Sequence, residues 1–423
     1  MDPESQNNIA FGSIYNNRVS MSDDTESGML DYSKPEYASN FTTYVDSKIS
    51  PLIQPYDNSM QTMKFSIGSL EDPYYSDLST LRCIGRLQVL HSDGSPLKKD
   101  EAISVCNLFP ETIFSQCNVY ISGLPVSDHG RGSHFKSYIQ KHYSCSKEVK
   151  SITLANNYYQ DDEIRPGQLA MEQVTVESMQ AEPGIIKRAK FIEQSKDVLF
   201  TFKPTFDLMS SEQALPPSYV LNLEFERNNE SFSLITHSGN QEQYKIRLFD
   251  FHLELRRFIP SKSAISQLPN PRSGTHFLSF TRQTVRFRAI HAGVTDINVP
   301  QIADSNGILP YSIMIIPLST DQSTNISKNP FIFWPKWIKK YNLLLNSSSL
   351  PGQALTVEGD HLDNGRAFNH FLENTNMGGT HSSNGISPFT YRYKDWAMVW
   401  DLCSDLCNGA HRHRPTSGKI HLM

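Results

Sequence analysis

The sequence predicts an all-β protein built from two tandem halves, each a β-sandwich. Short segments in which apolar and polar residues alternate recur along most of the 423 residues. Phe and Tyr are abundant, at 23 and 18 residues, whereas helical periodicity is confined to a few short stretches. Aromatic residues favour strands, and alternation gives each strand one dry face and one wet face, as in antiparallel sandwiches.

The first half is predicted over residues 61–265, after a polar arm at residues 1–60. The arm is rich in Ser, Asn, Asp and Tyr without a sustained period, and is predicted to be disordered because it cannot bury enough apolar surface. The clearest strand is SYVLNLEFER (218–227), with Leu221, Leu223 and Phe225 on one face. Three further segments show the same alternation: LRCIGRLQVLHSDG (81–94), QCNVYISG (116–123) and KDVLFTFKP (196–204).

The segment YKIRLFDFHLELRRFIPS (244–261) changes phase in its middle. Its apolar residues occupy even positions up to Leu248 and odd positions from Phe249 through Leu255. A slip of one residue inside a long strand predicts a β-bulge, because the bulge adds one unpaired residue to one strand.

Helical patterns are few. SHFKSYIQKHYS (133–144), with Ser133 as its N-cap, and RAFNHFLENTN (366–376) have apolar residues at helical spacing. The Pro- and Gly-rich segment QLPNPRSGTH (267–276) predicts a domain boundary. A second sandwich follows over 275–423. Its predicted strands are TVRFRAI (284–290), YSIMIIPL (311–318), KKYNLLLN (339–346) and DWAMVWDL (395–402).

Composition excludes several classes of protein. A net charge of −5 argues against a nucleic-acid coat, and the longest apolar stretch is too short to span a bilayer. The amino terminus lacks the features of a signal peptide. Six thinly spread cysteines favour reduced thiols in a cytosolic or nuclear setting over a disulfide scaffold.

No catalytic constellation emerges, so neither an enzymatic activity nor a cofactor is expected. The chain lacks a nucleophile elbow, a zinc-protease motif and a dinucleotide fingerprint, and HGRGSHFKS (129–137) does not have phosphate-loop spacing. The pair Asp161-Asp162 is interpreted as a solvated loop. The cluster of Lys187, Arg188 and Lys190 is interpreted as a solvated surface.

The carboxyl-terminal segment holds four residues of the types that bind zinc. They are Cys403, Cys407, His411 and His413. Zinc fingers place about a dozen residues between the cysteine pair and the histidines, whereas three residues separate Cys407 from His411. The spacing therefore favours a turn between strands over a metal site.

The order of several segments resembles the double-jelly-roll capsid proteins of Polinton (Maverick) elements and adintoviruses. The matching pieces are LFPETIFSQCNVYISGLPV, SHFKSYIQ, SYVLNLEFERNNESFSL, YKIRLFDFHLELRRFIPS, NPFIFWPKWIKKYNLLLNSSSLPGQAL and WDLCSDLCNGAHRHRPTSGKIHL. The resemblance implies two tandem jelly rolls with short helices between strands. Members of this family continue beyond GKIHL, so the second roll is expected to lack its final strands.

The resemblance also implies a structural role in a virion, with assembly in the host cytoplasm or nucleus. Three subunits would form a pseudo-hexameric capsomer of an icosahedral shell encoded by an integrated or virus-like element. The implied partners are other copies of the chain and a penton or minor capsid protein, without a membrane or sequence-specific nucleic acid. Exposed strand residues would then lie at subunit interfaces, and the candidates are Arg86, Arg256, Arg257, Arg286 and Trp337.

Two other functions stay open from the residues alone. A non-enzymatic ligand- or carbohydrate-binding β-sandwich of the host would use Tyr158, Tyr159 or Trp334 as exposed stacking platforms. A cupin-like metal enzyme would centre on His411 and His413, although the second cluster of ligands that such a site needs is missing.

Overall fold

The computed structural model describes most of the chain from residue 41 onward. The described residues are 41–52, 61–68, 73–126, 131–154, 158–162, 173–210, 214–217, 219–240, 242–262, 283–290, 308–319, 321–335, 338–357, 365–375, 377, 383–403 and 417–422. Over these ranges, none of the helices has the length and apolar character that crossing a membrane requires.

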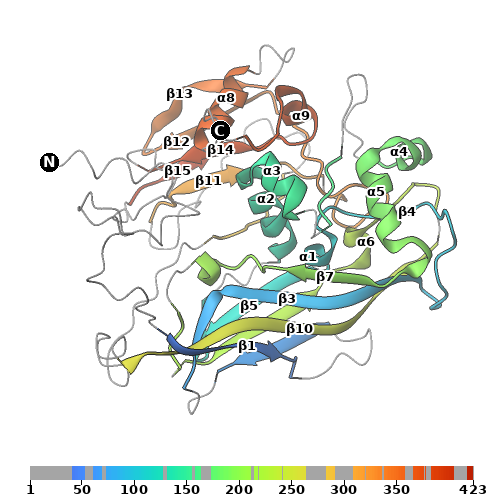
Figure 1. The fold of residues 1–423 in the computed structure, drawn as a ribbon. Helices are drawn as coiled ribbons and strands as arrows, with labels where there is room; N and C mark the ends of the chain where they lie inside the picture. The colour runs from blue at the N-terminus through green and yellow to red at the C-terminus, as the bar shows by residue number, and fades with distance from the viewer. Residues whose placement is uncertain are drawn as a thin grey trace, which may run out of the picture.

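The first sandwich consists of two four-stranded antiparallel sheets (Figure 1). One sheet has the order β1–β10–β3–β7, with β1 at Phe41–Ile49, β10 at Tyr244–Pro260, β3 at Tyr75–His91 and β7 at Val198–Phe202. The other has the order β2–β8–β5–β6, with β2 at Thr62–Ile67, β8 at Leu221–Arg227, β5 at Phe114–Ile121 and β6 at Leu124–Pro125. Apart from the β5–β6 hairpin, the chain changes sheet between successive strands of this set. Eight strands connected in this way form a jelly roll.

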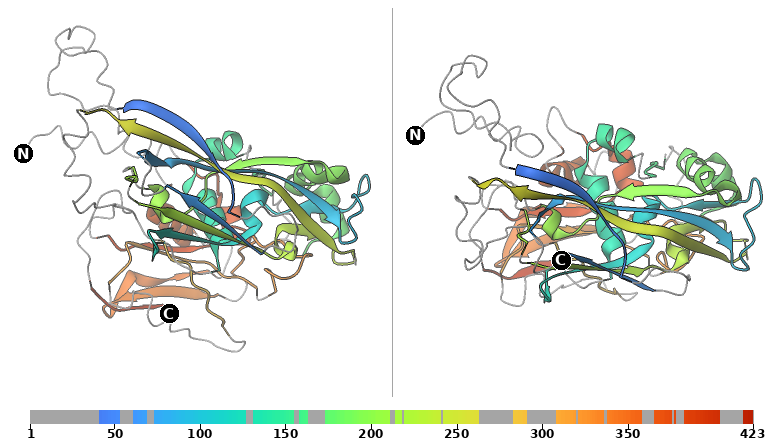
Figure 2. Two further views of the ribbon diagram at one scale, coloured as in Figure 1. Left: turned by 90° about the horizontal axis from the view of Figure 1, so that it is seen from below. Right: turned by 60° about the horizontal axis from the view of Figure 1, so that its bottom comes forward.

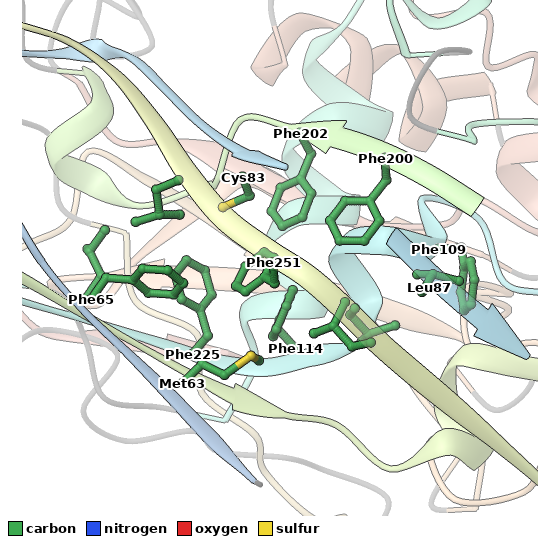
Figure 3. Packing of buried hydrophobic residues seen from close by; sticks show 14 of the residues in the cluster. Met63, Phe65, Cys83, Leu87, Phe109, Phe114, Phe200, Phe202, Phe225 and Phe251 are labelled. Carbon is green, nitrogen blue, oxygen red and sulfur yellow. The ribbon is translucent and has the colours of Figure 1, made fainter. Parts of the chain in front are cut away.

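Side chains from both sheets meet in an aromatic core between them (Figure 3). Phe251 of β10 lies at its centre, with its ring 5.1 Å from that of Phe114 and 5.4 Å from that of Phe65. Gly85 on β3 makes room for these rings, because a Cβ there would lie 2.7 Å from Phe200. A side chain at position 85 would therefore displace the core rather than fill a space.

The phase slip in residues 244–261 is a β-bulge, as predicted. The pairing of β10 with β3 shifts between Phe249 and His252, and Asp250 has a positive φ of 53°. Tyr244, Ile246 and Leu248 point into the core before the bulge, and Phe251, Leu253 and Leu255 do so after it. The prediction was wrong for Phe249, which lies on the outer face beside Asp250 because the bulge gives two consecutive residues an outward direction.

The second sandwich is described in two parts. β11 (Ser312–Ile315) pairs with β14 (Met398–Asp401), and a three-stranded sheet has the order β13 (Ser348–Thr356), β12 (Lys340–Leu345) and β15 (Ile420–Leu422). Residues 396–400 are all buried, because β14 has α8 (Gly365–Asn374) beside it as well as the sandwich core. The predicted one-sided alternation in DWAMVWDL is therefore absent.

The remaining elements are short. They are β4 (Ile103–Val105) paired with β9 (Leu234–Thr236), α1 (Phe109–Thr112), α2 (Ser133–Ser144), α3 (Lys147–Ile152), α4 (Val176–Ala181), α5 (Pro183–Ile192), α6 (Glu230–Ser233), α9 (Pro388–Tyr393) and the 3-10 turns Glu193–Ser195 and Asp207–Ser210. α2 is confirmed, but the hydroxyl of Ser133 accepts a hydrogen bond from the Cys117 amide of β5 instead of capping the helix. Helices α3 to α5 were not predicted.

The predicted strand TVRFRAI is not a strand. Residues 283–290 are described and carry no ladder pairing. Val285 and Phe287 instead lie against the start of α2, where the Phe287 ring meets that of Phe135 at 5.8 Å. The predicted boundary between the halves, at residues 267–276, lies outside the described residues.

Candidate assembly face and the junction between the sandwiches

Residue Arg86, a predicted interface residue, lies on the solvent side of the β1–β10–β3–β7 sheet, here called the outer face. Its guanidinium hydrogen-bonds Asp250 (Nε to Oδ2, 2.9 Å), lies 3.6 Å from an Asp197 carboxylate oxygen, and stacks over Phe249 at 5.0 Å. The Arg86 hydrogen bond lowers the pKa of Asp250. These contacts hold the guanidinium in one orientation. A partner can still reach it, because 45% of the Arg86 side chain is exposed.

Two further predicted residues, Arg256 and Arg257, lie near the carboxyl end of β10. Arg256 donates a 3.0 Å hydrogen bond to Asp46 of β1 and covers the ring of Tyr44. Arg257 faces the other side and covers Tyr74 at 5.2 Å. Partial burial lowers the pKa of Arg257. These two arginines therefore do not share one surface.

The other predicted interface residues are separate from these. Arg286 is exposed in the segment beside α2, and Trp337 lies outside the described residues. Of the four predicted interface residues that the structure describes, Arg86 and Arg256 share one sheet face, whereas Arg257 and Arg286 do not lie on it.

The two sandwiches meet around α2, which lies between them (Figure 1). Toward the first sandwich, Lys136 forms a 2.5 Å ion pair with the buried Asp207, and Lys141 pairs with the buried Glu111. Toward the second, the Tyr138 ring stacks on Phe331 at 3.8 Å. α2 is part of both sandwiches, because its charged residues pair with the first and its aromatic residues belong to the core of the second.

A buried histidine, His142, lies at the carboxyl end of α2. One ring nitrogen lies 2.8 Å from the Tyr159 hydroxyl and the other 2.9 Å from an Asp395 carboxylate oxygen. The Tyr143 hydroxyl donates to the Asp395 carbonyl at 3.0 Å. Burial lowers the pKa of His142. The two contacts with Asp395 join residues 253 and 252 positions apart in sequence, so they fix the second sandwich against α2.

Lys394 adds a second buried link beside Asp395. Its ammonium pairs with the carboxylate of Asp161 and donates a 2.8 Å hydrogen bond to the Asp162 carbonyl. Burial disfavours the ammonium, but the carboxylates of Asp161, Asp395 and Asp162 outweigh it and raise the pKa of Lys394. The neighbouring Lys150 donates to the Asn384 carbonyl at 2.6 Å, and burial lowers its pKa.

Arg188 completes this network, here called the junction. The side chain is fully buried and donates hydrogen bonds to the carbonyls of Val105 (2.8 Å) and Gln160, and to the carboxylate of Asp162 (2.7 Å). The other Asp162 oxygen accepts from Asn329 at 3.0 Å. The interpretation of Arg188 as a solvated surface residue was therefore wrong. Asp161 and Asp162 likewise belong to the junction rather than to a free loop.

Candidate ligand residues do not form a site in the described structure. Tyr159 is 4% exposed, so it is not a stacking platform, and Tyr158 packs edge-on against Phe191. Cys403 is buried with its sulfur 3.9 Å from the Tyr311 carbonyl, whereas Cys407, His411 and His413 lie outside the described residues. Over the described ranges, no three His, Cys, Asp or Glu side chains converge as metal ligands.

Buried histidines predict a loss of stability in acid. Burial lowers the pKa of His134, which lies 4.3 Å from the Phe232 ring, to about 4. His134 is protonated near pH 6.5 in the unfolded chain but only near pH 4 in the folded chain. The contribution of the neutral ring to the free energy of unfolding is therefore fully present above pH 6.5 and is lost as pH falls toward 4. A shift of this size corresponds to about 3 kcal/mol.

Urea unfolding measured at pH 7 and pH 4.5 tests this dependence. The free energy of unfolding is expected to fall between the two, and the fall is expected to shrink in His134→Gln. His237→Gln, at a partly exposed ring, is the matched control and is expected to keep the full pH dependence. Equal pH dependence in the parent and His134→Gln would contradict the assignment.

Comparison with solved structures defines the architecture. The chain is similar to a chain of the virophage Sputnik solved by cryo-electron microscopy, with a TM-score of 0.56, 12% identity, and coverage of 95% of this chain and 85% of that one. The chain is a double jelly roll. This double jelly roll also matches the mavirus major capsid protein (TM-score 0.40, 10% identity, 96% and 89% covered) and the Faustovirus major capsid protein (0.47, 9%, 92% and 88%). No family model matches the sequence, and no curated protein does.

Proposed function

We propose that this double jelly roll is a structural capsid protein whose subunits assemble as homotrimers into an icosahedral shell. The observation that carries the proposal is the junction, because it joins the two sandwiches into one body through the buried Arg188–Asp162 ion pair and buried hydrogen bonds. A shell subunit needs a rigid connection between its two sandwiches, because neighbouring subunits push on each of them and a hinge would let them move apart. Virion location and an origin in a Polinton-like or adintovirus-like element belong to the same proposal.

Arg86 is the described residue best placed for a contact between subunits on the outer face. Asp250 and Phe249 hold its guanidinium in one orientation, which lowers the entropy that a partner must remove on binding. Planar guanidinium groups bind carboxylates in a partner with two parallel hydrogen bonds. The partner surface is a second copy of the chain, in the three-fold arrangement that the resemblance implies.

Light scattering on the full-length chain, with negative-stain microscopy, tests the proposal. The expected result is a mass three times that of the monomer and particles with a pseudo-hexagonal outline. A monomer at every concentration, without particles, would overturn the assignment as a shell protein.

Arg86→Glu is expected to weaken trimer formation more than tenfold while leaving the midpoint of thermal unfolding nearly unchanged. The change reverses the charge that faces the partner, so this surface, with Asp197 and Asp250 beside it, repels the partner carboxylates that the guanidinium is proposed to bind. Lys64→Glu is the matched control, because Lys64 forms a comparable exposed ion pair with Glu224 on the opposite sheet. If the two variants form trimers equally well, Arg86 does not lie at the contact.

A further inference from the structure

Strand β1 forms an edge of the first sandwich. Within the described residues its one sheet neighbour is β10, so its other side presents unpaired backbone groups. Figure 2 shows β1 along the rim of the sheet. Residues 42–46 are exposed on both faces of the sheet, with Tyr44 at 66% and Val45 at 42%. An edge of this kind is a template for another strand.

Most devices that protect an edge strand are missing from this segment. The pairing with β10 runs without a shift from Thr43 to Ile49, and the strand FTTYVDSKI contains no proline. Its residues favour strands, since six of the nine are β-branched or aromatic. One lysine, Lys48, repels indiscriminate pairing, and a partner strand must therefore neutralise it.

We propose that β1 of one copy pairs antiparallel with β1 of a second copy about a two-fold axis at Ser47. In this register Asp46 lies opposite Lys48 of the other copy, and the reverse pair forms on the other side of the axis. Val45 then lies opposite Ile49. Asp46 can take part although Arg256 contacts it, because 62% of its side chain is exposed and a carboxylate accepts several hydrogen bonds.

Neighbouring registers are unfavourable for electrostatic reasons. A shift of the axis to Asp46 places the two Asp46 carboxylates opposite each other, and a shift to Lys48 does the same with the two ammonium groups. Like charges directly opposite destabilise a pair of strands. An axis between two residues would place an outward side chain opposite an inward one, which joins the polar face of one sheet to the apolar face of the other.

The two-fold symmetry of the β1 contact determines which subunits of the shell it can connect. A two-fold contact uses the same patch on both copies, whereas a closed three-fold ring needs two different patches. The β1 contact therefore cannot hold a trimer together and instead links two neighbouring trimers. This step rests on the proposed function, whereas pairing of β1 itself can be tested without it.

Disulfide trapping tests the register. Ser47→Cys places two thiols opposite each other at a Cα separation of about 4.5–5.5 Å, within the range of a disulfide. Thr43→Cys is the matched control, because its two copies would lie about 26 Å apart along the strands. Mild oxidation of the full-length chain is expected to give at least tenfold more covalent dimer with Ser47→Cys than with Thr43→Cys or the parent, whose six native cysteines set the background.

Charge exchange in the Ser47→Cys chain tests the partner pair. Asp46→Lys alone and Lys48→Asp alone are each expected to reduce the dimer severalfold, and the two together are expected to restore it. Equal dimer yields from Ser47→Cys and Thr43→Cys, or no recovery in the double exchange, would overturn the pairing. Trimer mass is measured separately under reducing conditions. Trimers without covalent dimers would reject the β1 contact and leave the proposed function intact. Covalent dimers without trimers would support the β1 contact and reject the proposed function.

Discussion

Replacing Phe251 by alanine is expected to lower the free energy of unfolding by about 3–5 kcal/mol. The side chain, on β10, is 1% exposed, and its ring contacts those of Phe65, Phe114 and Phe225, which all come from the opposite sheet of the first sandwich (Figure 3). Alanine would leave a cavity whose walls are strands of both sheets, so the site cannot collapse to fill it. Urea unfolding followed by circular dichroism measures the effect.

Phe249→Ala is the matched control for this prediction. It lies on the same strand two residues earlier, but the bulge at Asp250 turns its ring outward beneath the guanidinium of Arg86. Its removal is expected to cost about 1 kcal/mol or less, the size of an exposed cation–π contact. Similar losses in the two variants would show that the bulge does not divide the strand as described.

Lys394→Met is expected to destabilise the protein by about 1.5–3 kcal/mol, because it removes a buried ammonium that pairs with Asp161, whose side chain is 48% exposed, and donates a hydrogen bond to a main-chain carbonyl. The lysine is 1% exposed and contacts Asp161 and the Asp162 carbonyl, and Asp395 follows it in the chain. Methionine keeps most of the side-chain volume, so the loss reports on charge rather than on packing.

Lys196→Met is the control for Lys394→Met. Lys196 pairs with Glu193 at 3.1 Å with 55% of its side chain exposed, and removal of such a surface pair costs about 1 kcal/mol or less. The free energy of unfolding, measured at pH 7, separates the two cases. An equally small loss in both variants would contradict the assignment of Lys394 to a buried junction.

The sequence predicted those elements that are determined by residues adjacent in the chain. The alternation in residues 221–227 requires one buried face, and the phase slip in residues 244–261 requires an extra residue, so β8 and the bulge of β10 could be predicted. The alternation alone predicted two tandem sandwiches, and the resemblance to a family of capsid proteins implied that each is a jelly roll. The exact residue at which the bulge turns was missed, since Phe249 fits either phase.

The junction could not be predicted, because its members are polar residues that are far apart in sequence. Asp161, Asp162 and Arg188 have the composition of an exposed loop and helix, and only the fold brings Asp161 to Lys394, 233 positions away. His142 lies on an amphipathic helix and gives no sign that Asp395 will face it. The segment at residues 284–290 failed for the converse reason, since its alternation is that of a strand but its apolar residues rest on α2.

The most direct test of the central claim, that the two sandwiches form one body, is the tryptophan fluorescence of Phe251→Ala during urea unfolding. All four tryptophans lie in the second half of the chain, and Trp396 and Trp400 are buried in its core, far in sequence from the altered residue. The account predicts that the fluorescence midpoint falls as far as the circular dichroism midpoint. A fluorescence midpoint unchanged from that of the parent would show that the sandwiches unfold independently and would contradict the account.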